Sequence, residues 1–256
     1  MLTLITGASG GIGEALAREF AARGSDLILV ARSADKLKTL ADELARAHGI
    51  TAHVVPLDLA QTGAAARVAD AARAFGRIDV LVNNAGFATF GPFASSDLAV
   101  ELDEIRLNVE TLTELTKRVL PDVIAAKGKI LNVASTAAFQ PGPMMAVYYA
   151  TKAYVLSFSE ALSYELKPLG VQVTCLCPGP TKTGFQARAH QEGVRLLDVS
   201  LMDAAVVARA GVNGLFRGRA VVVPGFVNRV GFWVVRFSPR RTVLWTVNWL
   251  HQKKGA

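Results

Sequence analysis

The chain has 256 residues, of which 51% are hydrophobic and 19% charged. This composition is sufficient for a large buried core and excludes a disordered, collagen-like or low-complexity chain. The net charge is +7, and residues 204–256 hold nine Lys or Arg and no Asp or Glu. Residues 1–203 therefore hold 19 basic and 21 acidic side chains, a net charge of −2. The basicity is therefore local, which argues against nucleic acid as a partner of the whole domain.

The cysteines and the apolar stretches bear on the cellular location. Cys175 and Cys177 stand two apart in an apolar run, and we expect them to be reduced core residues of a cytoplasmic protein. Met1 runs into an apolar segment without a basic region or a cleavage site, so no secretion signal is expected. The apolar stretch at 231–235 is cut by arginines far short of the ~20 residues that a spanning helix needs.

Apolar runs alternate with segments of helical periodicity along the chain. The sequence predicts strands at Leu2–Ile5, Leu27–Ala31, Ala52–Leu57, Ile78–Val82, Lys129–Ala134, Val171–Cys177 and Ala220–Val223. It predicts helices at Glu14–Arg23, Lys36–Ala47, Ala64–Phe75, Glu101–Ala126 with a break at Pro121, Tyr148–Leu166 and Ala204–Phe216. Because the strands are apolar on both faces, we expect a single α/β domain with a Rossmann-like, doubly wound parallel sheet of about seven strands and helices on both faces.

A glycine-rich segment lies where the first strand meets the first helix. Residues 6–13 read Thr-Gly-Ala-Ser-Gly-Gly-Ile-Gly, and at such a junction backbone N–H groups and the helix dipole can bind a pyrophosphate. The cluster alone is also compatible with a simple turn into a helix. Its place after the first strand of an alternating chain favours a dinucleotide site.

The end of the second strand bears on the choice of dinucleotide. It reads Val30-Ala31-Arg32-Ser33, without the acidic residue that would bind the ribose hydroxyls of NAD. Arg32 can pair with a 2′-phosphate and stack on adenine, so NADP(H) is favoured and NAD(H) is the alternative. The competing interpretation is a solvated arginine at a strand end.

Tyr148 and Lys152 are four residues apart in a helical segment, which places the phenol and the ammonium on one face. A nearby cation favours the phenolate, so the sequence predicts a tyrosine pKa lowered from ~10 toward neutrality. Such a tyrosine can give a proton to a ketone oxygen or take one from an alcohol. By itself the spacing is common and also fits a purely structural pair.

The order and spacing of several motifs resemble the classical short-chain dehydrogenase/reductase family over about Leu2–Phe185. The matching segments are Thr6–Gly13, Asp58-Leu59, Asn83-Asn84-Ala85-Gly86, Leu107-Asn108-Val109, Ser135 thirteen residues before Tyr148, and Pro178-Gly179-Pro180-Thr181. The resemblance implies an NAD(P)-dependent oxidoreductase that acts on CH–OH or C=O groups.

The resemblance also implies roles for individual residues. Tyr148 would be the general acid/base, Ser135 would orient the substrate oxygen, Lys152 would hold the nicotinamide ribose and tune Tyr148, and Asn108 would support a proton-relay water. The cofactor would contact Tyr148, Lys152, Gly7, Ser9, Gly10, Gly11, Ile12, Gly13, Arg32, Ser33, Asp58, Leu59, Asn84, Ala85, Gly86, Pro178, Gly179 and Thr181. No metal site is expected. Tyr149 projects about 100° away from Tyr148 and is interpreted as a packing residue.

Two positions depart from the family pattern. Gly10 stands where NADP-binding members often carry a basic residue, which leaves Arg32 to provide the preference for the 2′-phosphate. Thr136–Phe139 lacks the commoner glycine, which would alter the wall of the substrate cleft.

The C-terminal part contains all three tryptophans, Trp233, Trp245 and Trp249. Ser238 and Pro239 predict a helix start, with Ser238 as N-cap, followed by an apolar stripe with basic residues at its ends. This helix could pack on its own domain or on a sister subunit; alternatively it could contact an anionic membrane surface peripherally or cover a lipophilic substrate. We expect a dinucleotide-binding catalytic unit at residues 1–225, with a lid at about 180–200, and a helical extension of the same domain at 226–256.

Three functions remain open on the sequence alone. The first is NADP-preferring hydride transfer to or from a lipophilic carbonyl or alcohol, such as a 3-oxoacyl thioester or a steroid-like compound. The others are NAD-linked alcohol oxidation and non-catalytic NADP sensing. The resemblance further implies a homodimer or homotetramer assembled through the helices at Glu101–Ala126 and Tyr148–Leu166.

Overall fold

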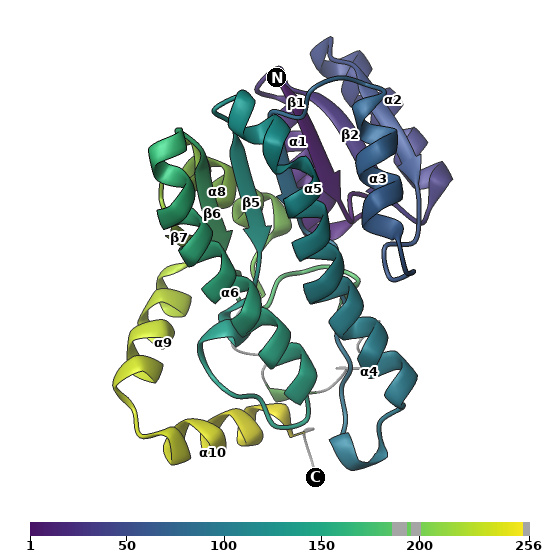
Figure 1. Cartoon of the computed structure of the whole chain (residues 1–256). Helices are drawn as coiled ribbons and strands as arrows, with labels where there is room; N and C mark the ends of the chain where they lie inside the picture. The colour runs from purple at the N-terminus through teal and green to yellow at the C-terminus, as the bar shows by residue number, and fades with distance from the viewer. Residues whose placement is uncertain (186–193, 196–200, 253–256) are drawn as a thin grey trace.

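A parallel seven-stranded sheet forms the centre of the computed structural model, which describes residues 1–185, 194–195 and 201–252 (Figure 1). The strand order is β3-β2-β1-β4-β5-β6-β7, and every neighbouring pair is parallel. The order changes direction between β1 and β4, which creates a crevice at their carboxyl ends. The strands are β1 (Leu2–Thr6), β2 (Asp26–Ala31), β3 (Ala52–Pro56), β4 (Val80–Asn83), β5 (Lys129–Val133), β6 (Gln172–Leu176) and β7 (Val221–Val222).

Helices cover both faces of the sheet. One face carries α1 (Gly11–Ala21), α2 (Ala34–His48) and α8 (Ala204–Phe216), and the other carries α3 (Ala64–Arg73), α5 (Leu112–Ala125) and α6 (Ala146–Leu166). Successive strand residues enter opposite cores, since Ile5 belongs to the first cluster and Leu4 to the second. The predicted single-domain, doubly wound α/β fold is therefore confirmed.

The helical segment before β5 differs from its prediction. It consists of α4 (Leu98–Ile105), a π-helical turn (Arg106–Thr111) and α5, which continues through Pro121. The predicted break is wrong because Pro121 is exposed, so that water can satisfy the carbonyl that loses its helical hydrogen bond. Short 3₁₀ turns lie at Phe93–Ser95, Thr136–Phe139 and Lys167–Leu169.

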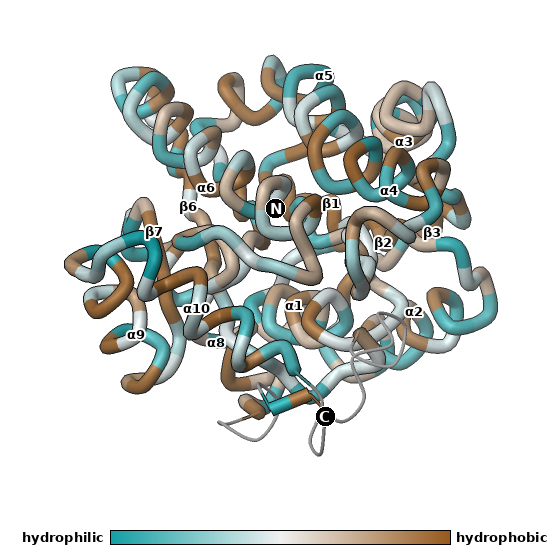
Figure 2. Tube along the Cα trace, turned by 90° about the horizontal axis from the view of Figure 1, so that it is seen from below, coloured by the Kyte–Doolittle hydropathy of each residue, from teal (hydrophilic) through white to brown (hydrophobic). Residues whose placement is uncertain are grey.

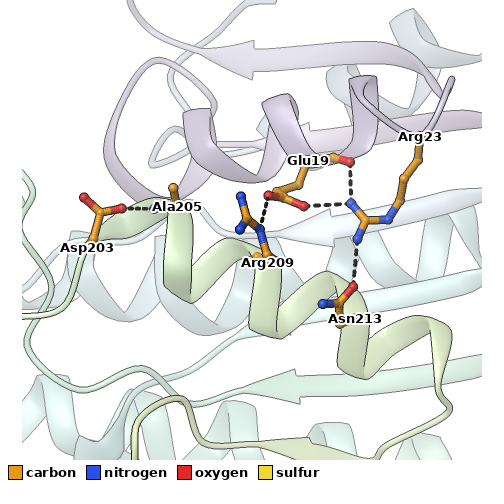
Figure 3. Close-up of polar contacts among 6 residues, drawn as sticks. All are labelled: Glu19, Arg23, Asp203, Ala205, Arg209 and Asn213. Carbon is orange, nitrogen blue, oxygen red and sulfur yellow. Dashed lines mark hydrogen bonds and ion pairs between the residues drawn. The ribbon is translucent and has the colours of Figure 1, made fainter.

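A polar network on the surface joins α8 to α1 (Figure 3). Glu19 pairs with Arg23 at 2.8 Å and with Arg209 at 3.1 Å, and Arg23 also donates to Asn213 Oδ1 at 2.8 Å. Below this network, the buried side chain of Val212 lies in the same core cluster as α1. These contacts fix α8 against the helix that begins at the glycine loop.

The C-terminal extension forms two helices, α9 (Phe226–Phe237) and α10 (Arg240–His251), and α10 crosses beyond the carboxyl ends of the strands (Figure 1). The predicted N-cap at Ser238 is wrong. Pro239 is the residue that precedes α10, and the Ser238 hydroxyl donates to Val234 O at 2.7 Å, at the end of α9. None of the described helices is long and apolar enough to span a bilayer.

The predicted lid at residues 180–200 lies mostly outside the described residues. At its start, Thr181 forms a parallel bridge with Met202, and Lys182 N donates to Met202 O at 2.8 Å. Thr183 lies against Gly11, since a Cβ on that glycine would be 3.0 Å from Thr183 Cγ2. The described start of the segment therefore covers the glycine loop.

Candidate active site

A cavity of about 850 Å³ opens at the carboxyl end of the sheet. Ser135, Tyr148 and Lys152 line it, whereas Asn108 lies behind its wall. All of the predicted cofactor residues also line it: Gly7, Ser9, Gly10, Gly11, Ile12, Gly13, Arg32, Ser33, Asp58, Leu59, Asn84, Ala85, Gly86, Pro178, Gly179 and Thr181, together with Tyr148 and Lys152. The parallel sheet thus brings segments far apart in the sequence to one edge.

The glycine loop after β1 forms one wall of the cavity. Gly7 adopts a φ of +67°, a conformation that other residues rarely tolerate. At Gly13 a Cβ would collide with the Gly7 carbonyl and the Asn84 side chain, so α1 begins in direct contact with the loop. A Cβ on Gly10 would meet nothing within 4 Å. The loop therefore leaves room for a phosphate at the N-terminus of α1.

The loop after β4 is tied to the glycine loop. Asn84 Nδ2 donates to Thr6 O at 2.9 Å and to Gly7 O at 3.2 Å. The Thr6 hydroxyl accepts from the backbone N–H groups of Asn84 and Ala85, both at 3.0 Å. These hydrogen bonds hold the two loops at a fixed separation across the crevice.

The end of the cavity beside α2 is basic. Arg32 follows β2 and is mostly exposed, with Nη1 4.0 Å from Asp58 Oδ2. Lys36, in the first turn of α2, lines the same end and was not identified from the sequence. Its place four residues after Arg32, at the start of the predicted helix, was the available signal. Two cations at a helix N-terminus are suited to binding a phosphate group.

Ser135, Tyr148 and Lys152 converge at the other end. Ser135 follows β5 and forms a side-chain hydrogen bond with Tyr148, while Ser135 Oγ also accepts from Ala137 N at 3.1 Å. Lys152 Nζ donates to Val133 O at 3.0 Å and lies 5.7 Å from the centre of the Tyr148 ring. Tyr148 and Lys152 are both buried, so their polar groups lie in a largely dehydrated site.

The electrostatics of this cluster differ from the sequence-based expectation. Burial raises the pKa of Tyr148 to about 12, although the hydrogen bond with Ser135 opposes the rise. Burial also lowers the pKa of Lys152 to about 8. The predicted lowering of the Tyr148 pKa is therefore wrong, because dehydration of the phenol dominates. At neutral pH the phenol is protonated and most of the lysine is charged.

Asn108 is buried in the π-helical turn between α4 and α5. Its Nδ2 donates to Phe87 O at 2.9 Å and to Thr151 Oγ1 at 3.1 Å, and its Oδ1 accepts from Phe87 N at 3.2 Å. A Cβ on Gly86 would lie 2.9 Å from Asn108 Oδ1 and 3.5 Å from Lys152 Nζ. Asn108 and Lys152 therefore approach the same glycine from behind the cavity wall.

Helix α10 supplies a histidine beside Tyr149, which itself lines the cavity. The Tyr149 hydroxyl lies 3.0 Å from His251 Nε2, and His251 Nδ1 lies 2.7 Å from Pro143 O. A carbonyl only accepts, so Nδ1 donates, and Nε2 of the neutral ring accepts from Tyr149. His251 is 2% exposed, and burial lowers its pKa, which keeps the ring neutral. The sequence did not identify His251, because 102 residues separate the pair.

A buried carboxyl group near the site was also missed. Glu104 Oε2 accepts from Thr89 N at 2.9 Å and from Thr89 Oγ1 at 3.0 Å, while Oε1 has no hydrogen-bond partner among the described residues. Burial raises the pKa of Glu104 to about 7. The Thr89 hydrogen bonds oppose this rise, and the nearby Glu101 adds to it by a smaller amount. Within the described part of the chain, no group of three or more His, Cys, Asp or Glu side chains could hold a metal ion.

Known sequences match this chain over most of its length. The family model for short chain dehydrogenases matches residues 2–193. The 11-beta-hydroxysteroid dehydrogenase-like 4A of Arabidopsis thaliana is 36% identical over 243 residues, which span 93% of this chain and 81% of the plant protein.

Solved structures agree with the sequence comparison. A short-chain dehydrogenase from Sphingobium yanoikuyae in complex with NADPH has a TM-score of 0.82 at 32% identity, covering 93% of this chain and 96% of that one. The bulky-bulky ketone specific alcohol dehydrogenase from Comamonas testosteroni has a TM-score of 0.77 at 29% identity, covering 93% and 95%. The fold, the site and these likenesses define an NAD(P)-dependent oxidoreductase acting on CH–OH or C=O groups. The chain belongs to the short-chain dehydrogenase/reductase family.

Proposed function

We propose that this enzyme prefers NADP(H) and transfers hydride between the nicotinamide and a carbonyl or secondary alcohol of a lipophilic substrate, with Tyr148 as the general acid/base. The observation that carries the proposal is the convergence of Ser135, Tyr148 and Lys152 in the cavity that the glycine loop lines.

The residues present fit an NADP(H) cofactor. The open backbone at Gly10, at the N-terminus of α1, would receive the pyrophosphate, and Arg32 with Lys36 would pair with the 2′-phosphate. When bound, the cofactor supplies or accepts the hydride. NAD(H) remains the alternative cofactor, because Asp58 lies 4.0 Å from Arg32 and competes for its guanidinium.

Tyr148 provides the proton in the reduction direction. Hydride adds to the carbonyl carbon, and the phenol proton passes to the carbonyl oxygen, which leaves an alcohol and a tyrosinate. The raised pKa keeps the phenol protonated before the reaction, and Ser135 orients the substrate oxygen. The Lys152 ammonium stabilises the tyrosinate, and Asn108 positions a water that returns a proton from solvent by way of Lys152. Alcohol oxidation is the reverse of these steps.

The walls near Tyr148 support a lipophilic substrate. Tyr148 and Tyr149 share a buried cluster with five apolar residues: Ala88, Ala137, Met145, Val243 and Val247. The last two come from α10. Apolar walls favour an apolar substrate body, such as a 3-oxoacyl thioester or a steroid-like compound. Because α10 packs into this cluster, residues 226–256 would extend the same domain as the catalytic unit at residues 1–225.

We also propose a homodimer or homotetramer in the cytoplasm. The segments predicted to assemble expose large hydrophobic side chains, among them Leu102 and Ile105 on α4 and Tyr164 on α6. Two free, buried cysteines fit a reducing compartment. Light scattering of the wild type and of Leu102→Glu tests the assembly, because a charge in such an interface should yield monomers.

NADPH oxidation with a panel of lipophilic ketones tests the reaction. The wild type should turn over at least one ketone, and Tyr148→Phe should lose roughly 10²-fold or more in kcat while still binding NADPH. Tyr154→Phe, an exposed position on the same helix, is the matched control. NADPH binding without turnover on a broad panel would instead favour the non-catalytic sensor.

Arg32→Asp tests the cofactor preference. The ratio of kcat/KM for NADPH to that for NADH should fall about tenfold or more, because the charge-assisted contact with the 2′-phosphate is lost. Lys36→Ala should lower the ratio by a smaller factor. An unchanged ratio in the Arg32 variant would contradict its role and favour the NAD-linked alcohol dehydrogenase.

A further inference from the structure

The outer side of α9 exposes an apolar stripe. Phe226, Val230, Trp233 and Phe237 recur with helical spacing, and their exposed fractions run from 45% at Val230 to 79% at Phe237. Figure 2 shows α9 at the edge of the molecule, with hydrophobic segments along it. Since globular proteins usually bury such a stripe, its exposure marks an interaction surface.

The opposite side of α9 packs against the rest of the domain, so the stripe faces outward. Phe232 packs edge-on against Phe139, with ring centres 4.5 Å apart, and Asn228 Nδ2 donates to Pro224 O at 2.8 Å. Asn228 also lies against Gly179, where a Cβ would collide with its side chain. The stripe therefore belongs to a helix that is packed on the domain through its other side.

Helix α10 exposes two further tryptophans. Val243 and Val247 are buried in the cluster around Tyr149, whereas Trp245 and Trp249 are 69% and 46% exposed. With Trp233 on α9, these are the only tryptophans of the chain. Tryptophan and tyrosine are the side chains enriched at membrane–water interfaces.

The charged side chains of α9 and α10 are all arginines. Arg229, Arg236, Arg240 and Arg241 are exposed, and none of them pairs with a carboxylate among the described residues. The sequence contains no Asp or Glu after residue 203. Apolar and tryptophan side chains bordered by arginines are typical of helices that lie in the interface of an anionic membrane.

A second copy of the chain fits this surface less well. In a two-fold dimer the surface would face itself, so arginines of both copies would meet with no carboxylate of the same segment to pair with them. Like charges across an interface are unfavourable. Anionic lipid headgroups supply the missing negative charge, and the bilayer covers the apolar stripe.

We propose that α9 and α10 dock the enzyme peripherally on an anionic lipid surface. The stripe of α9 inserts at the headgroup boundary, and the surrounding arginines pair with lipid phosphates. The inner side of α10 contacts the cavity through His251 and Tyr149, so docking places this wall of the cavity near the membrane. Membrane binding is measured without substrate, so its failure would leave the proposed reaction intact.

Tryptophan emission and vesicle co-sedimentation of the full chain test the docking. Because all tryptophans lie on α9 and α10, their emission reports on these two helices. Phosphatidylcholine vesicles that contain phosphatidylglycerol should pellet the protein and shift its emission to the blue. Pure phosphatidylcholine vesicles should bind it far more weakly, because they lack the anionic headgroups.

Matched variants locate the binding surface. Arg236→Gln should weaken binding roughly fivefold, since one arginine at an anionic surface contributes about 1 kcal/mol. Arg217→Gln, which removes the same charge at the end of α8, should not. Phe237→Ser should weaken binding roughly tenfold or more, whereas Phe93→Ser, exposed elsewhere, should not. Thermal unfolding and NADPH titration show that each variant is folded.

Three results would overturn the proposal. The first is no binding to either kind of vesicle. The second is equal loss of binding in the Arg217 or Phe93 controls, which would make the binding non-specific. The third is a wild-type dimer that Phe237→Ser converts to a monomer, without any vesicle binding, which would assign the surface to a second copy of the chain.

Discussion

Glu104 provides a stability prediction with a definite sign. Its carboxyl is 0% exposed, and its pKa is about 7 in the folded protein against a reference value of 4.5. A carboxyl whose folded pKa is raised costs stability as soon as the unfolded chain is ionised. The cost is absent well below the unfolded pKa, grows as the pH rises, and is complete above the folded pKa.

The size of the effect follows from the two pKa values. At about pH 8 both states are ionised, and the full shift corresponds to about 3 kcal/mol. At about pH 5 the folded group is protonated and the unfolded group only partly ionised, so the cost is about 1 kcal/mol. Glu104→Gln removes this titration and keeps an oxygen that accepts from Thr89. Relative to the wild type, its free energy of unfolding should therefore rise by about 2 kcal/mol between these pH values.

Urea unfolding of the wild type and Glu104→Gln at the two pH values measures this difference. Glu110→Gln is the matched control, because Glu110 is exposed in the neighbouring π-helical turn. The pH-dependent difference from the wild type should be larger for Glu104→Gln than for this control. If the difference between Glu104→Gln and the wild type is the same at both pH values, the argument from burial is wrong.

Substitutions in the cavity walls give two further predictions. Gly13→Ala should lose stable folding, because its Cβ collides with the Gly7 carbonyl. Gly10→Ala should melt like the wild type and bind NADPH roughly tenfold more weakly. Circular dichroism melting and NADPH titration separate the two variants, and equal melting of both would refute the collision. His251→Ala should lower the free energy of unfolding by about 2 kcal/mol, because it leaves the Tyr149 hydroxyl unpaired, and should raise KM for lipophilic ketones more than it changes kcat; an unchanged KM in steady-state kinetics would show that α10 does not reach the substrate.

The fold was predictable because two-sided burial leaves a clear pattern in the sequence. In β2, Leu27 and Leu29 enter one core and Ile28 and Val30 the other, so the strand reads as an unbroken apolar run. The predicted helix break at Pro121 was wrong, because hydrophobic periodicity does not show how that proline packs. Whether a proline breaks a helix depends on whether its face meets water or the core, and that depends on packing.

The motifs located the cavity, but they did not describe its interior. Residues that follow parallel strands meet at one edge of the sheet, which is why the predicted cofactor residues share one cavity. The pKa of Tyr148 depends on how completely its surroundings exclude water, and part of those surroundings comes from α10. Likewise, no local pattern connects Tyr149 with His251, because only the tertiary fold brings them together.

A crystal structure of the enzyme with NADP⁺ and a lipophilic ketone tests the central claim most directly. The ketone oxygen should lie within hydrogen-bond reach of both the Tyr148 hydroxyl and Ser135 Oγ, with the nicotinamide ribose beside Lys152 and the pyrophosphate on the glycine loop. A ketone oxygen bound away from Tyr148, or a dinucleotide seated outside this cavity, would contradict the assignment of the site.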